Sequence, residues 1–217
     1  MLRSEPDCPK NWEYKDVPSS DGLLARRSVS FLTTVRGLNP SQKASLSKDL
    51  RPLHGALFRT LTPPHFLYFA GHYRGEAYRC LLMYTVGISG DKRVGHPPGT
   101  VPMEMEKFAL DIARIISDMD LTFQAPSAWF SPEEKLLRAI QLVAALFVYF
   151  LEIHPFANGN GHMARMLIIC LLGRHDLYLK KDWPLHPRPS EPAYSRAIMD
   201  YRNGNRSSLH VLLLQCL

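Results

Sequence analysis

The chain has 217 residues, a length typical of one domain, and 46% of them are hydrophobic while 21% are charged. These fractions exclude a fibrous or wholly disordered chain, because the apolar side chains suffice for a buried core. The 26 lysine and arginine residues against 20 acidic ones give a net charge of +6, which suits an anionic ligand but does not by itself indicate nucleic acid.

The cysteines are scattered and form no Cys-x-x-Cys pair, which is typical of reduced thiols and not of a metal site or a disulfide framework. The four residues are Cys8, Cys80, Cys170 and Cys216. No charged amino-terminal region followed by an apolar one is present, so a Sec signal peptide is not expected. We therefore expect a cytoplasmic protein, with export by another route left open.

In chain order, residues 1–21 are polar and lack a helical period, so we expect a loose arm attached through Trp12 and Tyr14. The domain is expected to span residues 22–217. Its first helical signal is a set of apolar residues spaced three and four apart over residues 46–58, and Pro63-Pro64 ends that helix.

Residues 80–95 alternate between apolar and polar, which predicts two short strands around a turn at Ser89-Gly90-Asp91. Every other signal is helical. Ser131 followed by Pro132 and Glu134 is a strong helix start, and the apolar segment after it contains Arg138 and Glu152, which favours a buried core helix over a membrane span. Helices are expected over residues 101–119, 131–153, 162–173, 190–203 and 206–216. The prediction is an all-α fold with one β-hairpin.

The segment between the two most apolar helices, His154 to Arg165, carries the residues suited to chemistry. Asn158, Gly159 and Gly161 tolerate unusual backbone angles, and they directly precede a helix. The N–H groups of such a turn form a concave site for an anion such as phosphate, within reach of Arg165. His154 can take a proton near neutral pH. This combination predicts transfer of a phosphate-bearing group.

The segment His-Pro-Phe-Ala-Asn-Gly-Asn-Gly-His-Met-Ala-Arg at 154–165 resembles the signature of the Fic family, His-x-Phe-x-(Asp/Glu)-Gly-Asn-Gly-Arg-x-x-Arg. Leu-His-Gly-Ala-Leu-Phe at 53–58 and Ala-Gly-His-Tyr-Arg at 70–74 are similar to another segment of that family, and residues 194–204 to its C-terminal helix. The resemblance covers residues 22–217. It implies a Fic-type helical bundle with a flap at about 80–100 beside an active-site loop at 154–165.

The resemblance also implies an activity: transfer of AMP from ATP to a Ser, Thr or Tyr hydroxyl of a target protein that the flap binds in extended form. His154 would be the general base. Asn158 would hold Mg²⁺, and Tyr194 and Arg202 would lie on the nucleoside side. The phosphate-binding residues would be Gly159, Asn160, Gly161, His162 and Arg165.

Two positions depart from the signature. Asn158 stands for the acidic residue and brings no charge to a magnesium ion, and His162 stands for the first arginine and lacks its bidentate fork. Two alternatives therefore stay open: a degenerate, non-enzymatic module that binds a nucleotide or a target, and a Doc-like toxin that phosphorylates its target under control of a partner antitoxin. The family's inhibitory (Ser/Thr)-x-x-x-Glu-(Gly/Asn) motif is absent, so restraint would come from a separate inhibitor or from residues 1–21. No membrane or nucleic-acid partner is expected.

Overall fold

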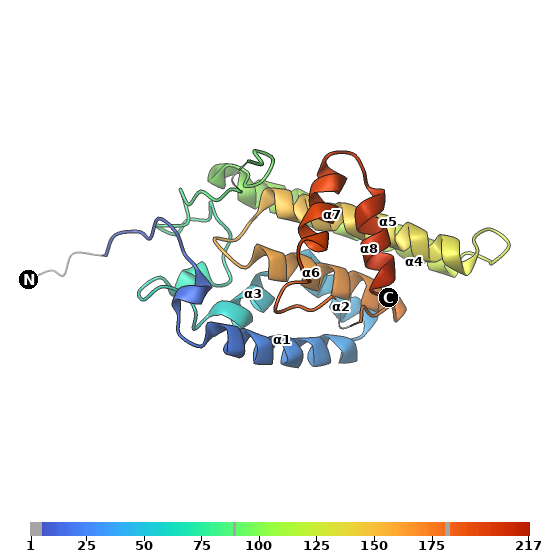
Figure 1. Cartoon of the computed structure of the whole chain (residues 1–217), viewed down its shortest axis with the longest axis horizontal. Helices are drawn as coiled ribbons and strands as arrows, with labels where there is room; N and C mark the ends of the chain where they lie inside the picture. The colour runs from blue at the N-terminus through green and yellow to red at the C-terminus, as the bar shows by residue number, and fades with distance from the viewer. Residues whose placement is uncertain (1–5, 89, 181–182) are drawn as a thin grey trace, which may run out of the picture.

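The computed structural model describes residues 6–88, 90–180 and 183–217, and all of its regular elements there are helices (Figure 1). The all-α prediction is confirmed. The α-helices are α1 Ser20–Gly37, α2 Pro40–Lys48, α3 Arg51–Phe58, α4 Val101–Gln124, α5 Pro132–Ile153, α6 Asn160–Leu172, α7 Ala193–Arg202 and α8 Ser207–Gln215. Short 3₁₀ turns lie at Tyr14–Asp16, Leu67–Phe69, Pro98–Thr100 and Gly173–His175.

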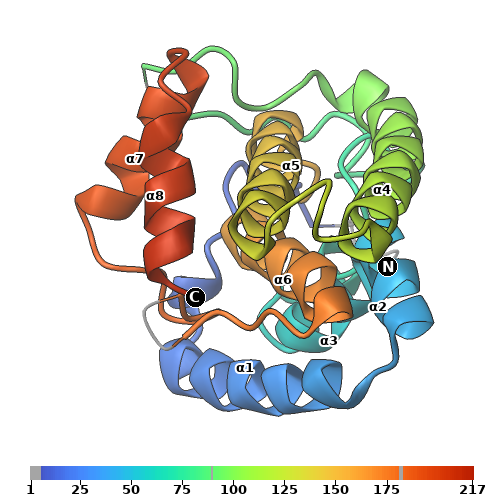
Figure 2. The same cartoon turned by 90° about the vertical axis from the view of Figure 1, so that its right-hand side faces the viewer.

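Helix α5 is the centre of the bundle, with α4 on one side, α7 and α8 on the other, and α6 below it (Figure 2). It begins as predicted: Ser131 accepts a hydrogen bond from the Glu134 N–H, and the Glu134 carboxylate accepts one from the Ser131 N–H. Among the described residues, α5 is the one helix long and apolar enough to cross a bilayer, and 56% of its most apolar window is buried inside the protein. That burial fits a core helix.

The chain around α2 and α3 differs from the single helix expected over residues 46–58. The helix is interrupted at Asp49 and Leu50, where the Asp49 side chain accepts hydrogen bonds from the Arg51 backbone N–H and guanidinium. Pro52 lies in the first turn of α3, where a missing N–H costs nothing. The apolar spacing was right, but a local side chain–backbone contact divides the helix.

The two strands expected over residues 80–95 are not formed in the described chain. An isolated bridge between Ile88 and Asp91 is the one β contact in the described part of this segment, and Ser89 lies outside the described residues. The segment bonds instead to the end of α5: the Gly95 N–H donates to the Glu152 carbonyl at 2.8 Å, and the His96 N–H to Ile153 at 3.3 Å. These backbone groups are thus paired with the end of α5.

From residue 6 onward, the arm is attached to the domain. Trp12 is buried, and its indole N–H donates to the Leu61 carbonyl at 2.9 Å. Cys8 forms a disulfide with Cys80, which corrects the prediction that both are reduced. Their separation of 72 residues left no spacing signal for the pair. Cys170 is a buried thiol, as predicted.

Candidate active site

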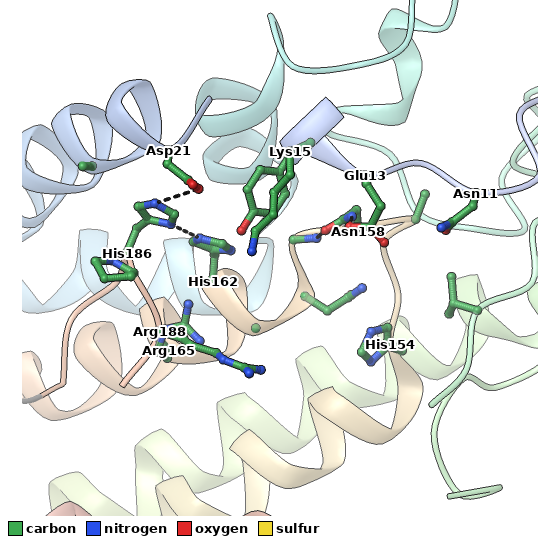
Figure 3. A pocket seen from close by; sticks show the side chains of 18 of the residues that line it. Asn11, Glu13, Lys15, Asp21, His154, Asn158, His162, Arg165, His186 and Arg188 are labelled. Atoms are coloured by element: carbon green, nitrogen blue, oxygen red, sulfur yellow. Dashed lines mark hydrogen bonds and ion pairs between the residues drawn. The ribbon is translucent and has the colours of Figure 1, made fainter. Parts of the chain in front are cut away.

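A pocket of about 980 Å³ opens where five segments meet (Figure 3). Its walls come from residues 11–15 of the arm, the first turns of α1, residues 85–87, the loop and helix start at 154–165, and residues 186–188. The structure therefore gathers His154, Asn158, Gly159, Asn160, Gly161, His162 and Arg165 around one space.

His154 ends α5 in the left-handed conformation, with φ of 52°. This turn directs the chain from α5 into the loop and places the imidazole at the pocket. A carbonyl oxygen can only accept, so Nδ1 carries the proton that bonds the Leu151 carbonyl at 3.0 Å, and Nε2 keeps its lone pair. Burial lowers the pKa of His154 to about 4. The side chain is a neutral imidazole at pH 7, with one nitrogen able to accept a proton.

Arg74 holds the backbone on which His154 sits. Its buried guanidinium donates to the carbonyls of Ile153 and His154 at the end of α5, at 3.0 and 2.8 Å. It also donates to the carbonyls of Tyr84 and His96, both at 3.1 Å. A cation is favourable at a helix C-terminus, where carbonyls have no intrahelical partner. Arg74 thus joins the flap to the end of α5.

The loop is held rigid by its own polar side chains. The Asn160 side chain accepts from the Phe156 N–H and donates to the Phe156 carbonyl, both at 2.8 Å. His54 accepts from the Gly71 N–H through Nδ1, so its Nε2–H donates to the Asn158 carbonyl, at 2.9 Å. Asn160 therefore offers the pocket its backbone N–H, while its side chain shapes the loop.

The predicted anion site lies at the start of α6. The first N–H groups of a helix have no intrahelical acceptor, and here those of Asn160 and Gly161 lie at the pocket. The buried Arg165 guanidinium donates to the Leu185 carbonyl at 2.8 Å, and no carboxylate of the described chain lies within 4.0 Å of it. An unneutralised guanidinium beside free N–H groups favours an anionic ligand.

His162, at the position of the signature's first arginine, uses its polar atoms differently. Its Nε2 lies 3.1 Å from Nδ1 of His186, whose Nε2 lies 3.5 Å from the Asp21 carboxylate. Since the carboxylate only accepts, His186 presents Nε2–H to Asp21, and its Nδ1 accepts a hydrogen bond from the His162 Nε2–H. Burial lowers the pKa of His162 well below its usual value. The residue lines the pocket as a neutral group, and its phosphate-binding role stays a prediction.

Asn158 was predicted to hold Mg²⁺. Its side-chain oxygen accepts from the Gly159 N–H at 2.5 Å, and its NH₂ group donates to the Trp12 carbonyl at 2.7 Å and to Glu13 Oε2 at 3.0 Å. Both ends of the amide are thus engaged. No group of three or more His, Cys, Asp or Glu side chains gathers for a metal in the described chain. A site with so few protein ligands fits a magnesium ion that is held mainly by nucleotide phosphates, because one or two protein carboxylates suffice for such an ion.

The two residues expected on the nucleoside side differ in placement. The Tyr194 hydroxyl lies behind Arg165, accepting from its guanidinium at 3.4 Å. Arg202 is buried away from the pocket lining and pairs with Asp91 at 3.2 Å and Glu152 at 3.6 Å. Tyr194 thus contacts a pocket residue, Arg165. Arg202 and its two acidic partners are not among the residues that line the pocket.

The sequence interpretation considered the arm only as a possible restraint on the site, and it missed residues 186–188. Glu13, Lys15 and His186 line the pocket, although they lie far in sequence from residues 154–165. Trp12 was the one available signal, because an aromatic side chain in a polar segment indicates attachment to a core.

Comparisons with known proteins agree with this geometry. The family model described as "Fic/DOC family" matches residues 45–172, more than half of the chain. The crystal structure of the VirB-translocated effector protein BepC from Bartonella tribocorum, with bound AMPPNP, superposes with a TM-score of 0.63 at 17% identity, over 91% of this chain and 83% of that one. A comparison with curated protein sequences found no match. With its loop, helix start and arginine in the matched region, the chain belongs to the Fic/DOC family.

Proposed function

We propose that the protein transfers AMP from ATP to a Ser, Thr or Tyr hydroxyl of a target protein. One observation carries the proposal: the proton-accepting nitrogen of neutral His154 shares a pocket with the N-terminus of α6 and with Arg165. A general base next to an anion site is the equipment for attack of a hydroxyl on a phosphate.

The donor is proposed from the pocket's charge and from the neighbour's ligand. Lys15, Arg165 and Arg188 line the pocket, and the structurally similar BepC binds AMPPNP. The N–H groups of Asn160 and Gly161 would hold a phosphate oxygen, and the Arg165 guanidinium the distal phosphates. A bound magnesium ion would neutralise phosphate charge, and Asn158 and neighbouring carboxylates would be its protein ligands.

In the proposed step, the target hydroxyl gives its proton to Nε2 of His154 while its oxygen bonds to the α-phosphorus. The bond between that phosphorus and the bridging oxygen breaks, and pyrophosphate leaves. The imidazolium formed would be unfavourable in a buried site beside Arg74 and Arg202, which lower the pKa of His154 further. Negative phosphates in the pocket would offset this, so the nucleotide itself would strengthen the base.

The flap is the proposed dock for the target. Residues 85–87 line the pocket, belong to no helix or strand, and form no β-bridge in the described chain. Such a backbone offers N–H and carbonyl groups for strand addition by a target segment carrying the hydroxyl. Since Arg165 has no carboxylate partner in the described chain, we also propose that restraint comes from a separate inhibitor or antitoxin that places a carboxylate there.

Two specific features favour a second candidate, a module that binds nucleotide without transfer. The Asn158 amide is engaged at both ends, and His162 is neutral and bonded to His186. Asn158 brings no carboxylate to hold a magnesium ion, and His162 brings no positive charge to a leaving pyrophosphate. A Doc-like phosphate transfer is the third candidate, since it would use the same base and the same anion site.

Labelled nucleotides separate the three candidates. The full chain is incubated with ATP labelled at the α- or the γ-phosphate, together with a lysate of its host, and labelled proteins are resolved on a gel. We expect label from α-ATP and none from γ-ATP. Label from γ-ATP alone would indicate phosphorylation, and binding of ATP with neither label would indicate the non-enzymatic module.

A further inference from the structure

Glu13 of the arm places a carboxylate beside the signature position that has lost one. Its Oε2 lies 3.0 Å from the Asn158 NH₂ group, and both side chains face the pocket on the side of His154 (Figure 3). A carboxylate at position 158 would lie within one hydrogen-bond length of this one. This chain therefore lacks the carboxylate that the family signature has in the loop, but the arm places a carboxylate next to that position.

The position of Glu13 is fixed from both sides. Trp12 before it is buried, with its indole bonded to Leu61 and its carbonyl bonded to Asn158. Tyr14 after it packs against Phe58, with ring centroids 5.7 Å apart. A residue between two anchored neighbours has little freedom to leave the pocket wall, although its own side chain is exposed.

The Glu13 carboxylate has no cationic partner. No Lys, Arg or His side chain of the described chain lies within 4.0 Å of it, whereas Asp21, the other carboxylate at the pocket, lies 3.5 Å from His186 Nε2. An uncompensated carboxylate beside a phosphate site repels phosphates unless a cation lies between them. Hard oxygen ligands of this kind suit Mg²⁺ that is bound mainly by nucleotide phosphates.

We propose that Glu13 supplies the carboxylate that Asn158 lacks and holds the divalent cation of a metal–nucleotide complex. This inference rests on the proposed function, because it requires a nucleotide in the pocket. Asn158 is then a positioning residue: its NH₂ group holds the Glu13 carboxylate and the Trp12 carbonyl in place.

Calorimetry of the full chain with AMPPNP tests this, each variant being titrated with magnesium chloride and with EDTA. For Glu13→Gln we expect the Kd with magnesium to rise about tenfold, because a ligand charge is lost, and the Kd without metal to fall, because a repulsion is lost. The control Asp16→Asn removes an exposed acid of the same arm outside the pocket and should match the wild type.

A double variant moves the charge back to the loop. Glu13→Gln combined with Asn158→Asp keeps one donor and one acceptor in this pair with their roles exchanged, but it loses the bond to the Trp12 carbonyl, so the preference for magnesium should recover in part and exceed that of Glu13→Gln alone. Thermal unfolding of each variant shows whether it is folded before titration.

The outcomes are distinct. Unchanged affinities for Glu13→Gln, or tighter binding by the same factor with and without magnesium, would overturn the inference, the second by showing that Glu13 only obstructs the pocket. A folded double variant that prefers magnesium no more than Glu13→Gln alone would also overturn it, because a carboxylate returned to the loop would then not attract the metal. A wild type that binds no nucleotide under either condition would overturn the proposed function itself.

Discussion

At the residue scale, His154 is oriented by a backbone carbonyl and not by a carboxylate. Its Nδ1–H bonds to Leu151, and the two nearby charges that affect its pKa, Arg74 and Arg202, are both positive. Burial, and then these two positive charges with no acidic side chain of the described chain to offset them, lower the pKa of His154 to about 4. A base this weak is a poor proton acceptor until phosphates occupy the pocket, which would couple proton transfer to nucleotide binding.

Gly159 is the loop residue whose replacement we expect to be most costly. Its φ is 79°, and a Cβ there would lie 2.5 Å from Phe58 Cε2 and 3.1 Å from His54 Nε2. Gly159→Ala combines left-handed strain with overpacking against buried rings, so we expect the free energy of unfolding to fall by about 2–5 kcal/mol in urea titrations.

The matched control for this substitution is Gly204→Ala. Gly204 also has positive φ, 96°, but a Cβ there would meet nothing within 4 Å. Only the backbone strain remains, at about 1–2 kcal/mol. Equal losses for the two variants would show that the contact with Phe58 and His54 is not as tight as described.

At the element scale, the end of α5 is the junction between the flap and the active-site loop. Arg74 bonds carbonyls of both, and the Gly95 N–H adds a bond from the flap to Glu152. A flap attached through a buried arginine keeps residues 85–87 at the pocket without a strand partner in the described chain.

Replacing Arg74 with lysine tests this junction. An ammonium group cannot reach all four carbonyls in the geometry of a guanidinium, so buried carbonyls lose partners and we expect a loss of about 2–4 kcal/mol in unfolding free energy. Arg114→Lys is the control: that side chain is 74% exposed and pairs only with Asp111, so its change should stay within about 0.5 kcal/mol. A similar small effect for Arg74→Lys would remove the junction from the account.

The sequence predicted those helices whose signals are local. Ser131, Pro132 and Glu134 defined the start of α5, because a capping box involves neighbours in the chain. Helix α1 was missed because only four of its 18 residues are buried and two of those are serines, so its sequence shows a weak apolar period. The strands expected within the flap do not form in the described chain, because the segment bonds to Arg74 and to carbonyls of α5, which no local rule identifies.

At the scale of the whole molecule, the site is assembled from segments at both ends and the middle of the chain. Residues 154–165 were predictable, since one contiguous motif contains the base, the turn and the arginine. The contact between Glu13 and Asn158 spans 145 residues, and that between His162 and His186 depends on where the loop before α7 lies. Such pairings follow from packing of the whole bundle and leave no periodic signal.

The buried histidines predict how the stability of the whole fold depends on pH. Burial lowers the pKa of His54 to about 3 and that of His154 to about 4, against 6.5 in the unfolded chain. Below pH 6.5 the unfolded chain therefore binds protons that the folded chain does not, and the free energy of unfolding falls as pH decreases toward 4. We expect a slope of roughly 1 kcal/mol per pH unit for each such histidine.

Urea unfolding between pH 7 and pH 5 measures this slope. His154→Asn should reduce it by the contribution of one histidine, because asparagine does not titrate and tolerates the left-handed conformation at this position. His65→Asn, at an exposed position that also has positive φ, should keep the wild-type slope. A wild-type stability that does not change over this range would contradict the burial of His54 and His154.

The central claim is that His154 is the base of a transfer reaction at this pocket. Its most direct test is the single-turnover rate of AMP transfer, compared between the wild type and His154→Asn together with the nucleotide Kd of both. We predict a rate lower by about 10²–10⁴-fold with a Kd within about twofold, because the base acts on the hydroxyl and not on nucleotide binding. Transfer by His154→Asn at the wild-type rate would contradict the account.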